Sequence, residues 1–328
     1  MNGGVFMDSA FIERLRRNYH AHFNFTGTTS FEGGFSIALQ YTLNNRVYSG
    51  LQHEKVVKQL RLPTPLGSVM HGYGNDPVLL DKIAAKFIID GHIDESIAQL
   101  HKQIQVLKDA GFSSGYNLYY AALFLQDAAH AKRAKLFFDE MKRNQRILTR
   151  KSDYPITVLL TKRDGDVKQL ADTVYKYYEA LKEQDFKAGD QLQMLAQYLA
   201  FYSEHFVTDL VGYAVQLKKQ IAAHGLRVTR NIYPFIGLLA LNATNEMKLS
   251  EVLQTMNHIL QQKDFKHMKM LAFSAAVFKS LTEKTTEETL TFEQEVEWFD
   301  LMLYSDIFLV LPKMLIESII SLDFNIFQ

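Results

Sequence analysis

Segments containing glycine and histidine are the first places in this chain where residue types and spacing suggest chemistry. Gly72-Tyr73-Gly74 and Gly33-Gly34 look like fragments of phosphate-binding loops. Neither follows a predicted strand or completes the spacing that places several amides around one phosphate, so we interpret both as loop glycines. The sequence contains no Gly-x-Ser-x-Gly or His-Glu-x-x-His segment. This weakens an enzymatic interpretation but leaves open an active site assembled from distant residues.

The histidines and acidic residues do not predict a metal site. His20 and His22 are two residues apart, a spacing that points the rings about 200 degrees apart on a helix. His71 and His92 stand near predicted turns with no carboxylate at metal-ligand spacing. We expect each of these four histidines to be a surface or capping residue. The segment 164–166 lacks the other oxygen ligands of a calcium loop and is interpreted as a turn and helix cap. With no cysteine either, we predict no metal, no cofactor and no catalytic residue.

An apolar residue recurs about every 38 residues and anchors a predicted module of two helices. The intervals are 36, 38, 40 and 39 residues, and the anchors are Phe112, Leu148, Phe186, Leu226 and Phe265. Apolar residues follow six positions after each anchor. A small residue stands ten or eleven positions after four of the five anchors, where it would let a neighbouring helix approach: Ala122, Ala196, Gly237 and Ala275. Such periodicity is typical of stacked helical hairpins, each unable to bury its apolar face alone.

The spacing of apolar residues predicts an all-α protein. Apolar residues recur at intervals of three and four, period-two runs are missing, and Gly111 and Gly225 mark helix ends. The predicted architecture is an α-solenoid-like, right-handed stack of helical hairpins. We expect an N-terminal helical cap at 1–62, a repeat array at 63–282 and C-terminal capping helices at 283–328, since the ends of an array must be covered.

A polar residue occupies the fifth position after four of the five anchors and predicts a partner-binding face. With the residues two positions further on, an amide- and tyrosine-rich surface would follow the second helices of the modules. Such a surface suits a peptide, because amides satisfy backbone groups and tyrosine supplies contact area. Alternatively, these are first-turn residues that satisfy unpaired amides. The candidate residues are Asn117, Tyr119, Asp153, Gln191, Gln193, Asn231 and Tyr233.

Charge and composition narrow the possible partners. The chain has 36 basic and 36 acidic residues, so no global positive field favours nucleic acid. The segment 132–151 nevertheless holds eight basic against two acidic residues, which fits either an acidic partner or the solvated face of an amphipathic hairpin. No segment has the apolar length needed to cross a membrane or the features of a signal peptide. Without cysteines to oxidise, a cytoplasmic location is expected.

Short motifs in the middle of the chain resemble a known family. Ile147-Leu148-Thr149 is followed by Ser152-Asp153-Tyr154, and Gly189-Asp190-Gln191-Leu192-Gln193 precedes Leu195. These segments are similar to a family of all-helical proteins of unknown function found mainly in Gram-positive bacteria, with the similarity strongest from about residue 90 to residue 281. A serine common in the family is Ala196 here. The resemblance implies an all-helical cytoplasmic bacterial protein, but no activity, cofactor or catalytic residue.

Two functional hypotheses follow. The first is a non-enzymatic helical-repeat scaffold that binds a peptide or protein through the predicted face. The second is an enzyme with a pocket at the junction of the N-terminal region and the repeat array, using residues such as His71, Tyr73, Asp76 or His92. The sequence favours the scaffold, because stacked hairpins create an extended binding surface without needing a catalytic cleft.

Overall fold

The computed structural model describes residues 3–26, 31–61, 77–241 and 249–284. Every regular element in these ranges is a helix, and they contain no strand, so the prediction of an all-α protein is confirmed. Contacts divide the chain into two compact units. Unit 1 comprises the described residues of 1–93 and 255–275, and unit 2 those of 94–254 and 276–284. The three-part division expected from the sequence stays a prediction.

Unit 1 is built mainly from four helices near the N-terminus. They are α1 (Gly3–Thr26), α2 (Phe31–Leu43), α3 (Gly50–Arg61) and α4 (Pro77–Asp90), joined by the parts of α13 (Leu249–Leu260) and α14 (Lys269–Lys284) that fall within residues 255–275. α1 packs against α2, and α3 against α4. Ile37, Tyr41, Tyr48 and Ala85 form one buried cluster of this unit.

Residues far apart in the sequence meet in unit 1 around Phe265. The ring of this fully buried anchor lies 5.2 Å from the ring of Tyr19 and 5.2 Å from that of Phe35, both in near-perpendicular geometry. Beside it, Asp264 accepts hydrogen bonds from Arg16 at 3.1 Å and pairs with His20 at 3.0 Å. The fifth anchor of the predicted array therefore packs against α1 and α2.

Unit 2 is a run of long and short helices in alternation. The long helices are α5 (Ile93–Asp109), α7 (Ala128–Asn144), α9 (Val167–Glu183) and α11 (Thr208–Ala223), with 16 or 17 residues each. The short helices are α6 (Tyr116–Leu123), α8 (Tyr154–Leu160), α10 (Asp190–Leu199) and α12 (Tyr233–Leu241). Single 3-10 turns, η1 (Lys151–Asp153) and η2 (Arg230–Ile232), precede α8 and α12.

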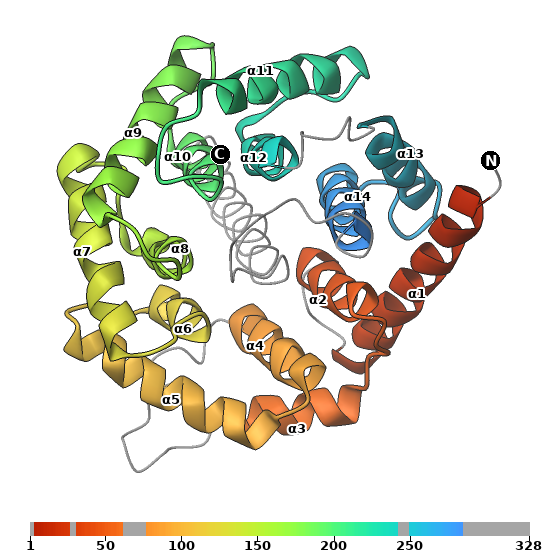
Figure 1. The fold of residues 1–328 in the computed structure, drawn as a ribbon. Helices are drawn as coiled ribbons and strands as arrows, with labels where there is room; N and C mark the ends of the chain where they lie inside the picture. The colour runs from red at the N-terminus through yellow and green to blue at the C-terminus, as the bar shows by residue number, and fades with distance from the viewer. Residues whose placement is uncertain (1–2, 27–30, 62–76, 242–248, 285–328) are drawn as a thin grey trace, which may run out of the picture. The chain divides into compact units, whose positions relative to one another are not determined.

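The helices of unit 2 lie in two rows (Figure 1). The first row holds α5, α7, α9 and α11, and the second row holds α6, α8, α10 and α12. First-row helices bury one face, as α9 does with Leu170, Val174, Tyr177 and Leu181. Second-row helices are more completely buried, and every residue of α8 and α12 is buried. Helices of 7 to 10 residues are marginal in isolation, so burial against neighbours must hold the second row in place.

Local signals placed the ends of several helices correctly. Gly111 and Gly225 follow α5 and α11 with φ values of 94 and 77 degrees, the left-handed backbone that glycine adopts at no steric cost. Asp166 accepts the amide hydrogens of Lys168 and Gln169, which confirms a cap at the segment 164–166. Within the described residues, no helix is long and apolar enough to cross a membrane.

Candidate functional sites

The seven residues of the predicted partner-binding face lie near the beginnings of the second-row helices and in the 3-10 turns before them. Two of them reach solvent: Gln191 is half-buried and Asn231 is exposed. Five are buried inside the protein: Asn117, Tyr119, Asp153, Gln193 and Tyr233. A peptide resting on this surface would contact mainly the two accessible side chains. The partner-binding role of the seven residues stays a prediction.

Two buried polar residues of this set, Asp153 and Gln193, connect neighbouring helical segments. Gln193 of α10 donates its side-chain amide to Thr149 Oγ1 at 3.3 Å, and Gln197, one turn later, donates to Asp153 Oδ1 at 2.9 Å. The other carboxylate oxygen of Asp153 accepts the backbone N–H of Arg150 at 2.8 Å. Gln197 was not among the residues predicted from the sequence, although it stands four residues after Gln193 and therefore lies on the same helix face.

Among the described acidic residues of unit 2, Asp153 has the most perturbed pKa. Burial raises its pKa to about 6, and the neighbouring charge of Asp190 acts in the same direction, while the hydrogen bonds from Arg150 and Gln197 oppose the shift. The side chain belongs to a residue only 6% exposed. Its protonation therefore changes near neutral pH, within a contact that joins two modules.

An aromatic contact recurs between modules. The ring of Phe112 lies 4.8 Å from that of Tyr154, and the ring of Phe186 lies 4.9 Å from that of Tyr233. In both cases the tyrosine hydroxyl accepts the backbone N–H of the residue after the phenylalanine: Ser113 at 3.4 Å and Lys187 at 3.0 Å. The loop after an anchor is thus fixed in the same way at two places in unit 2.

The first-row helices α9 and α11 run parallel to each other. Along α9 and α11, Thr173 contacts Glu204 O at 2.6 Å near one end, and Lys218 donates to Asp185 O at 2.8 Å near the other. Acidic residues begin these helices, as Asp94 and Glu95 in α5 and Asp209 in α11 do. Basic residues stand in the last turns: Lys108, Lys142, Arg143 and Lys182. Both placements suit the helix dipoles.

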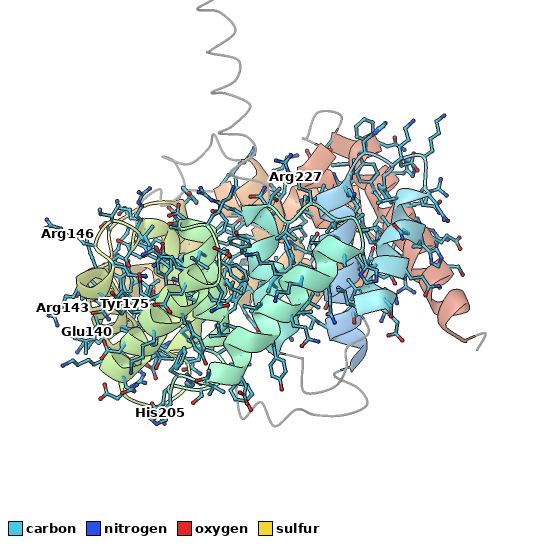
Figure 2. All side chains as sticks on the ribbon, turned by 90° about the horizontal axis from the view of Figure 1, so that it is seen from above. Glu140, Arg143, Arg146, Tyr175, His205 and Arg227 are labelled. Atoms are coloured by element: carbon cyan, nitrogen blue, oxygen red, sulfur yellow. The ribbon has the colours of Figure 1, made fainter. Side chains whose placement is uncertain are left out.

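Internal pairing accounts for part of the basic stretch at 132–151. Lys135 pairs with Asp139 at 2.6 Å, Arg143 pairs with Glu140, and Arg133 donates to Gly165 O at 2.6 Å. Figure 2 shows Glu140, Arg143, Arg146 and Tyr175 on the same side of unit 2. Ile147 stands beside Arg146 and is 79% exposed. The turn after α7 therefore presents an apolar side chain among basic ones.

Unit 1 contains a buried group of histidine, tyrosine and carboxylate side chains that the sequence analysis missed. The ring of His22 lies 5.1 Å from that of Tyr48 and 6.2 Å from that of His53. His53 Nε2 lies 3.3 Å from Asp81 Oδ1. Asn18 positions the group, since its side chain accepts the N–H of Tyr48 at 2.9 Å and donates to backbone and hydroxyl oxygens of the same region.

Burial keeps two members of this group, the imidazole of His22 and the phenol of Tyr48, uncharged over a wide pH range. It lowers the pKa of His22 to about 4, with the charge of His53 acting in the same direction and that of Asp81 opposing it. Burial, assisted by Asp81, also raises the pKa of Tyr48. Neither ring nitrogen of His22 has a hydrogen-bond partner among the described residues. No local pattern announces this arrangement, because its members come from four different segments.

The structure corrects one expectation about histidine. His22 is fully buried instead of lying at the surface, because it projects from α1 toward the segments that carry Tyr48 and His53. His20 is half-exposed and His92 exposed, as expected. His71, Tyr73 and Asp76 lie outside the described residues. Among the described residues no group of three or more histidines and carboxylates is placed to hold a metal ion.

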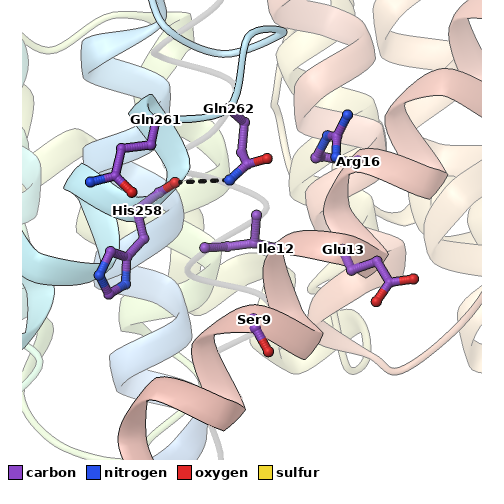
Figure 3. A pocket seen from close by; sticks show the side chains of 7 residues that line it. All are labelled: Ser9, Ile12, Glu13, Arg16, His258, Gln261 and Gln262. Carbon is purple, nitrogen blue, oxygen red and sulfur yellow. Dashed lines mark hydrogen bonds between the residues drawn. The ribbon is translucent and has the colours of Figure 1, made fainter.

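Open hollows occur in both units but gather little chemistry. In unit 1, α1 and the end of α13 enclose a hollow lined by Ser9, Ile12, Glu13, Arg16, His258, Gln261 and Gln262. Figure 3 shows Gln262 turned back to bond the backbone oxygen of His258, at 3.4 Å. A second hollow follows α11 and includes Tyr213. Neither encloses a buried charged group, so the polar sites described above are the stronger candidates.

Comparison with known proteins places the chain in a family. One similar protein is the uncharacterized protein YeaA of Bacillus subtilis (strain 168), with 28% identity over 153 residues. That match covers 47% of this chain and 46% of the relative, so it spans about half the length of each. No solved structure matches. The model of a family described as a protein of unknown function, DUF4003, matches residues 29–299. The resemblance inferred from the sequence is thereby confirmed, and the chain belongs to this family.

Proposed function

We propose that this protein is a non-enzymatic, cytoplasmic helical-repeat scaffold that binds a peptide or protein through unit 2. In this proposal the helix pairs of unit 2 form an α-solenoid-like, right-handed stack with a period of about 38 residues. The observation that carries it is the recurrence of one inter-module contact, between the phenylalanine anchor of one module and a second-row tyrosine of the next, as in Phe112–Tyr154 and Phe186–Tyr233.

This recurrence supports a scaffold because it repeats in its details. Each contact combines an edge-to-face ring pair with a hydrogen bond from the following backbone N–H to the tyrosine hydroxyl. Ring geometry and hydrogen bond together fix the loop after the anchor. A stack fixed in this way presents successive loops in a regular row, and such rows are what repeat proteins use to bind extended partners.

Gln191 and Asn231 are the members of the predicted face through which a partner would bind. Both stand at the start of a second-row helix or turn and keep solvent access. Their amides can donate to and accept from a peptide backbone. The five buried members, by contrast, are not accessible to a partner.

Site-specific photo-crosslinking in a Bacillus host tests this proposal. A photoreactive amino acid is placed separately at Gln191, at Asn231 and, as a control, at the exposed Gln216 of α11. We expect the first two positions to capture the same protein, identified by mass spectrometry, and Gln216 not to capture it. The proposal would be overturned by an absence of protein adducts at both loop positions, or by equal capture from Gln216.

A second candidate function is binding of a small polar ligand, with or without acid–base chemistry, by unit 1. The observation favouring it is the buried pair His53–Asp81 beside His22, whose ring nitrogens are unpaired among the described residues. Buried polar atoms normally have partners. Native mass spectrometry of the protein purified from its host should then reveal a bound small molecule that the His53→Gln variant loses and the His20→Gln variant keeps. A wild-type protein of unaltered mass would contradict this role.

A further inference from the structure

We infer that one edge of unit 2 binds an extended acidic protein segment. This edge, called the basic edge below, is made by three loops that each connect a first-row helix to a second-row helix. The inference rests on the proposed scaffold function and adds the chemistry of the partner. The residues of the basic edge are Arg146, Arg150, Lys151, Lys187, Arg227 and Arg230.

Contacts between loops place these residues side by side. The loop at 145–152 touches the preceding loop, because Lys151 donates to Ser114 O at 3.2 Å. It is joined to the next module by the Thr149–Gln193 hydrogen bond. A Cβ atom on Gly189 would lie 3.7 Å from an Nη atom of Arg230, so the loop at 184–190 adjoins the loop at 224–231. The three loops therefore form a continuous edge.

The charge of the edge is not balanced locally. All six basic residues are exposed. The same three loops contain only two acidic residues, Asp185 and Asp190. None of the six takes part in an ion pair within the part of the chain that the structure describes. The side chains of Arg150 and Lys151 bond backbone oxygens, whereas no side-chain hydrogen bond is found for Arg146, Lys187 or Arg227 among the described residues.

Helix-dipole compensation does not explain these charges. The carboxyl-terminal ends of three first-row helices reach this edge, and each already carries basic residues in its last turn or the turn before. Loop residues beyond the helix end lie outside that role, because the dipole effect fades within one turn. At the opposite ends of the same helices stand Asp127, Asp166 and Asp209. Figure 2 shows Arg146 and Arg227 toward one edge and His205 toward the other.

The geometry specifies the partner. Arginine binds carboxylates through two parallel hydrogen bonds, and Ile147, 79% exposed beside Arg146, offers an apolar contact. Neighbouring packed helices are about 10 Å apart, and an extended chain in the polyproline II conformation rises about 3.1 Å per residue and returns every third side chain to the same face. A peptide along the edge would therefore meet a new loop about every three residues. The favoured ligand is an acidic segment with Glu or Asp at every third position and an apolar residue near Ile147.

A peptide of this design provides the test. The probe is a fluorescein-labelled peptide of about nine residues that can adopt the polyproline II conformation, with Glu at every third position and one Leu. Its control has Gln in place of Glu. Binding to the full-length protein is followed by fluorescence anisotropy at low salt, where exposed charges are screened least. An oligothymidine of similar length serves as the nucleic-acid probe.

Two triple variants distinguish the effect of the basic edge on peptide binding from the effect of removing positive charge anywhere on unit 2. In Arg146→Gln/Lys187→Gln/Arg227→Gln, three edge charges without a described hydrogen bond are removed. In Lys132→Gln/Lys168→Gln/Lys176→Gln, three exposed charges elsewhere on unit 2 are removed. We expect the edge variant to bind the Glu peptide at least about ten times more weakly and the control variant to stay within about twofold. Circular dichroism melts confirm that both variants are folded.

Three outcomes would overturn the inference: equal weakening in both variants, tighter binding of oligothymidine than of the Glu peptide, and no preference of the wild type for Glu over Gln. Each is distinguishable from failure of the scaffold proposal. If Gln191 and Asn231 still capture a common protein, the scaffold stands and only the acidic chemistry of its partner is wrong.

Discussion

Asp153 carries a carboxyl group whose ionisation costs folding energy. Its pKa is raised to about 6 in the folded protein from an ordinary value of 3.8, so its contribution to stability is fully present below pH 3.8 and is lost as pH rises through 6. The shift of roughly two units corresponds to about 3 kcal/mol at neutral pH. The folded protein is thus most stable when the side chain at position 153 is neutral.

Replacing Asp153 by Asn should therefore stabilise unit 2 at pH 7. The Asn oxygen can accept the N–H of Arg150, and Gln197 can turn its amide to accept from the Asn nitrogen. Because some charge-assisted hydrogen bonding is lost, we expect a net gain of about 1 kcal/mol, measured by urea unfolding. The exposed Asp185→Asn variant is the control and should change little. A loss of stability in Asp153→Asn would show that the carboxylate is favourable where it lies.

His22 has the opposite pH dependence. Its pKa is lowered to about 4 from 6.5, so its contribution to stability is fully present above pH 6.5 and is lost as pH falls through 4. Between pH 7 and pH 5 the wild type should lose about 2 kcal/mol from this residue. His22→Leu should remove that loss with little effect at pH 7, whereas His205→Gln, at an exposed position, should leave it intact. Urea unfolding of the three proteins at pH 7 and at pH 5 measures these changes in the free energy of unfolding.

At the scale of helices, Gly237 allows α12 to approach α10. A Cβ atom there would lie 3.0 Å from Leu195 Cδ1 and 3.0 Å from Tyr198 Cβ. The second contact is with an atom close to the backbone, which cannot move aside easily. The sequence prediction that a small residue is needed at this position has its physical reason here.

Alanine substitutions at two helical glycines should act in opposite directions. Gly237→Ala gains helix propensity but overpacks the contact with α10, and we expect a net loss of about 1–2 kcal/mol. Gly212, in α11, has open space around the Cβ position, so Gly212→Ala should gain about 0.5–1 kcal/mol. Thermal unfolding of both variants provides the measurement. Stabilisation by Gly237→Ala would mean that α10 shifts readily.

Helix content was predictable because it depends on local patterns. The intervals of three and four residues, the glycine ends at Gly111 and Gly225, and the cap at Asp166 are each encoded within a few residues. The position five after the anchor was also predictable as a helix start, but its exposure was not. Whether Gln193 faces solvent or Thr149 depends on a neighbour 44 residues away, and spacing along one helix does not determine that contact.

At the scale of the whole molecule, long-range contacts could not be predicted from the sequence. Phe265 fits the periodic pattern of the anchors, yet its ring packs against Tyr19 and Phe35 in unit 1. The His22, Tyr48, His53 and Asp81 group likewise comes from separate segments. The residues next to each of these side chains in the sequence do not predict its role. Its burial, and any shift of its pKa, depend on packing between helices that are distant in the sequence.

The two buried titrating groups should give the units opposite responses to mild acid. From pH 7 to pH 5, protonation of Asp153 should raise the free energy of unfolding of unit 2 by about 1 kcal/mol. Over the same range His22 should lower the free energy of unfolding of unit 1 by about 2 kcal/mol, because the imidazole binds a proton in the unfolded chain but not in its buried position. Hydrogen exchange, corrected for the pH dependence of the chemical rate, should then show slower exchange of α8 and α10 and faster exchange of α1 at pH 5.

The variants assign these responses to single residues. Asp153→Asn should abolish the slowing in α8 and α10 and keep the change in α1, and His22→Leu should do the reverse. Titrating groups shared by all the proteins cancel in these differences, as in a double-mutant cycle. If both variants respond to pH as the wild type does, the buried carboxyl and imidazole do not govern acid sensitivity, and exposed pairs such as His20–Asp264 become the source to examine.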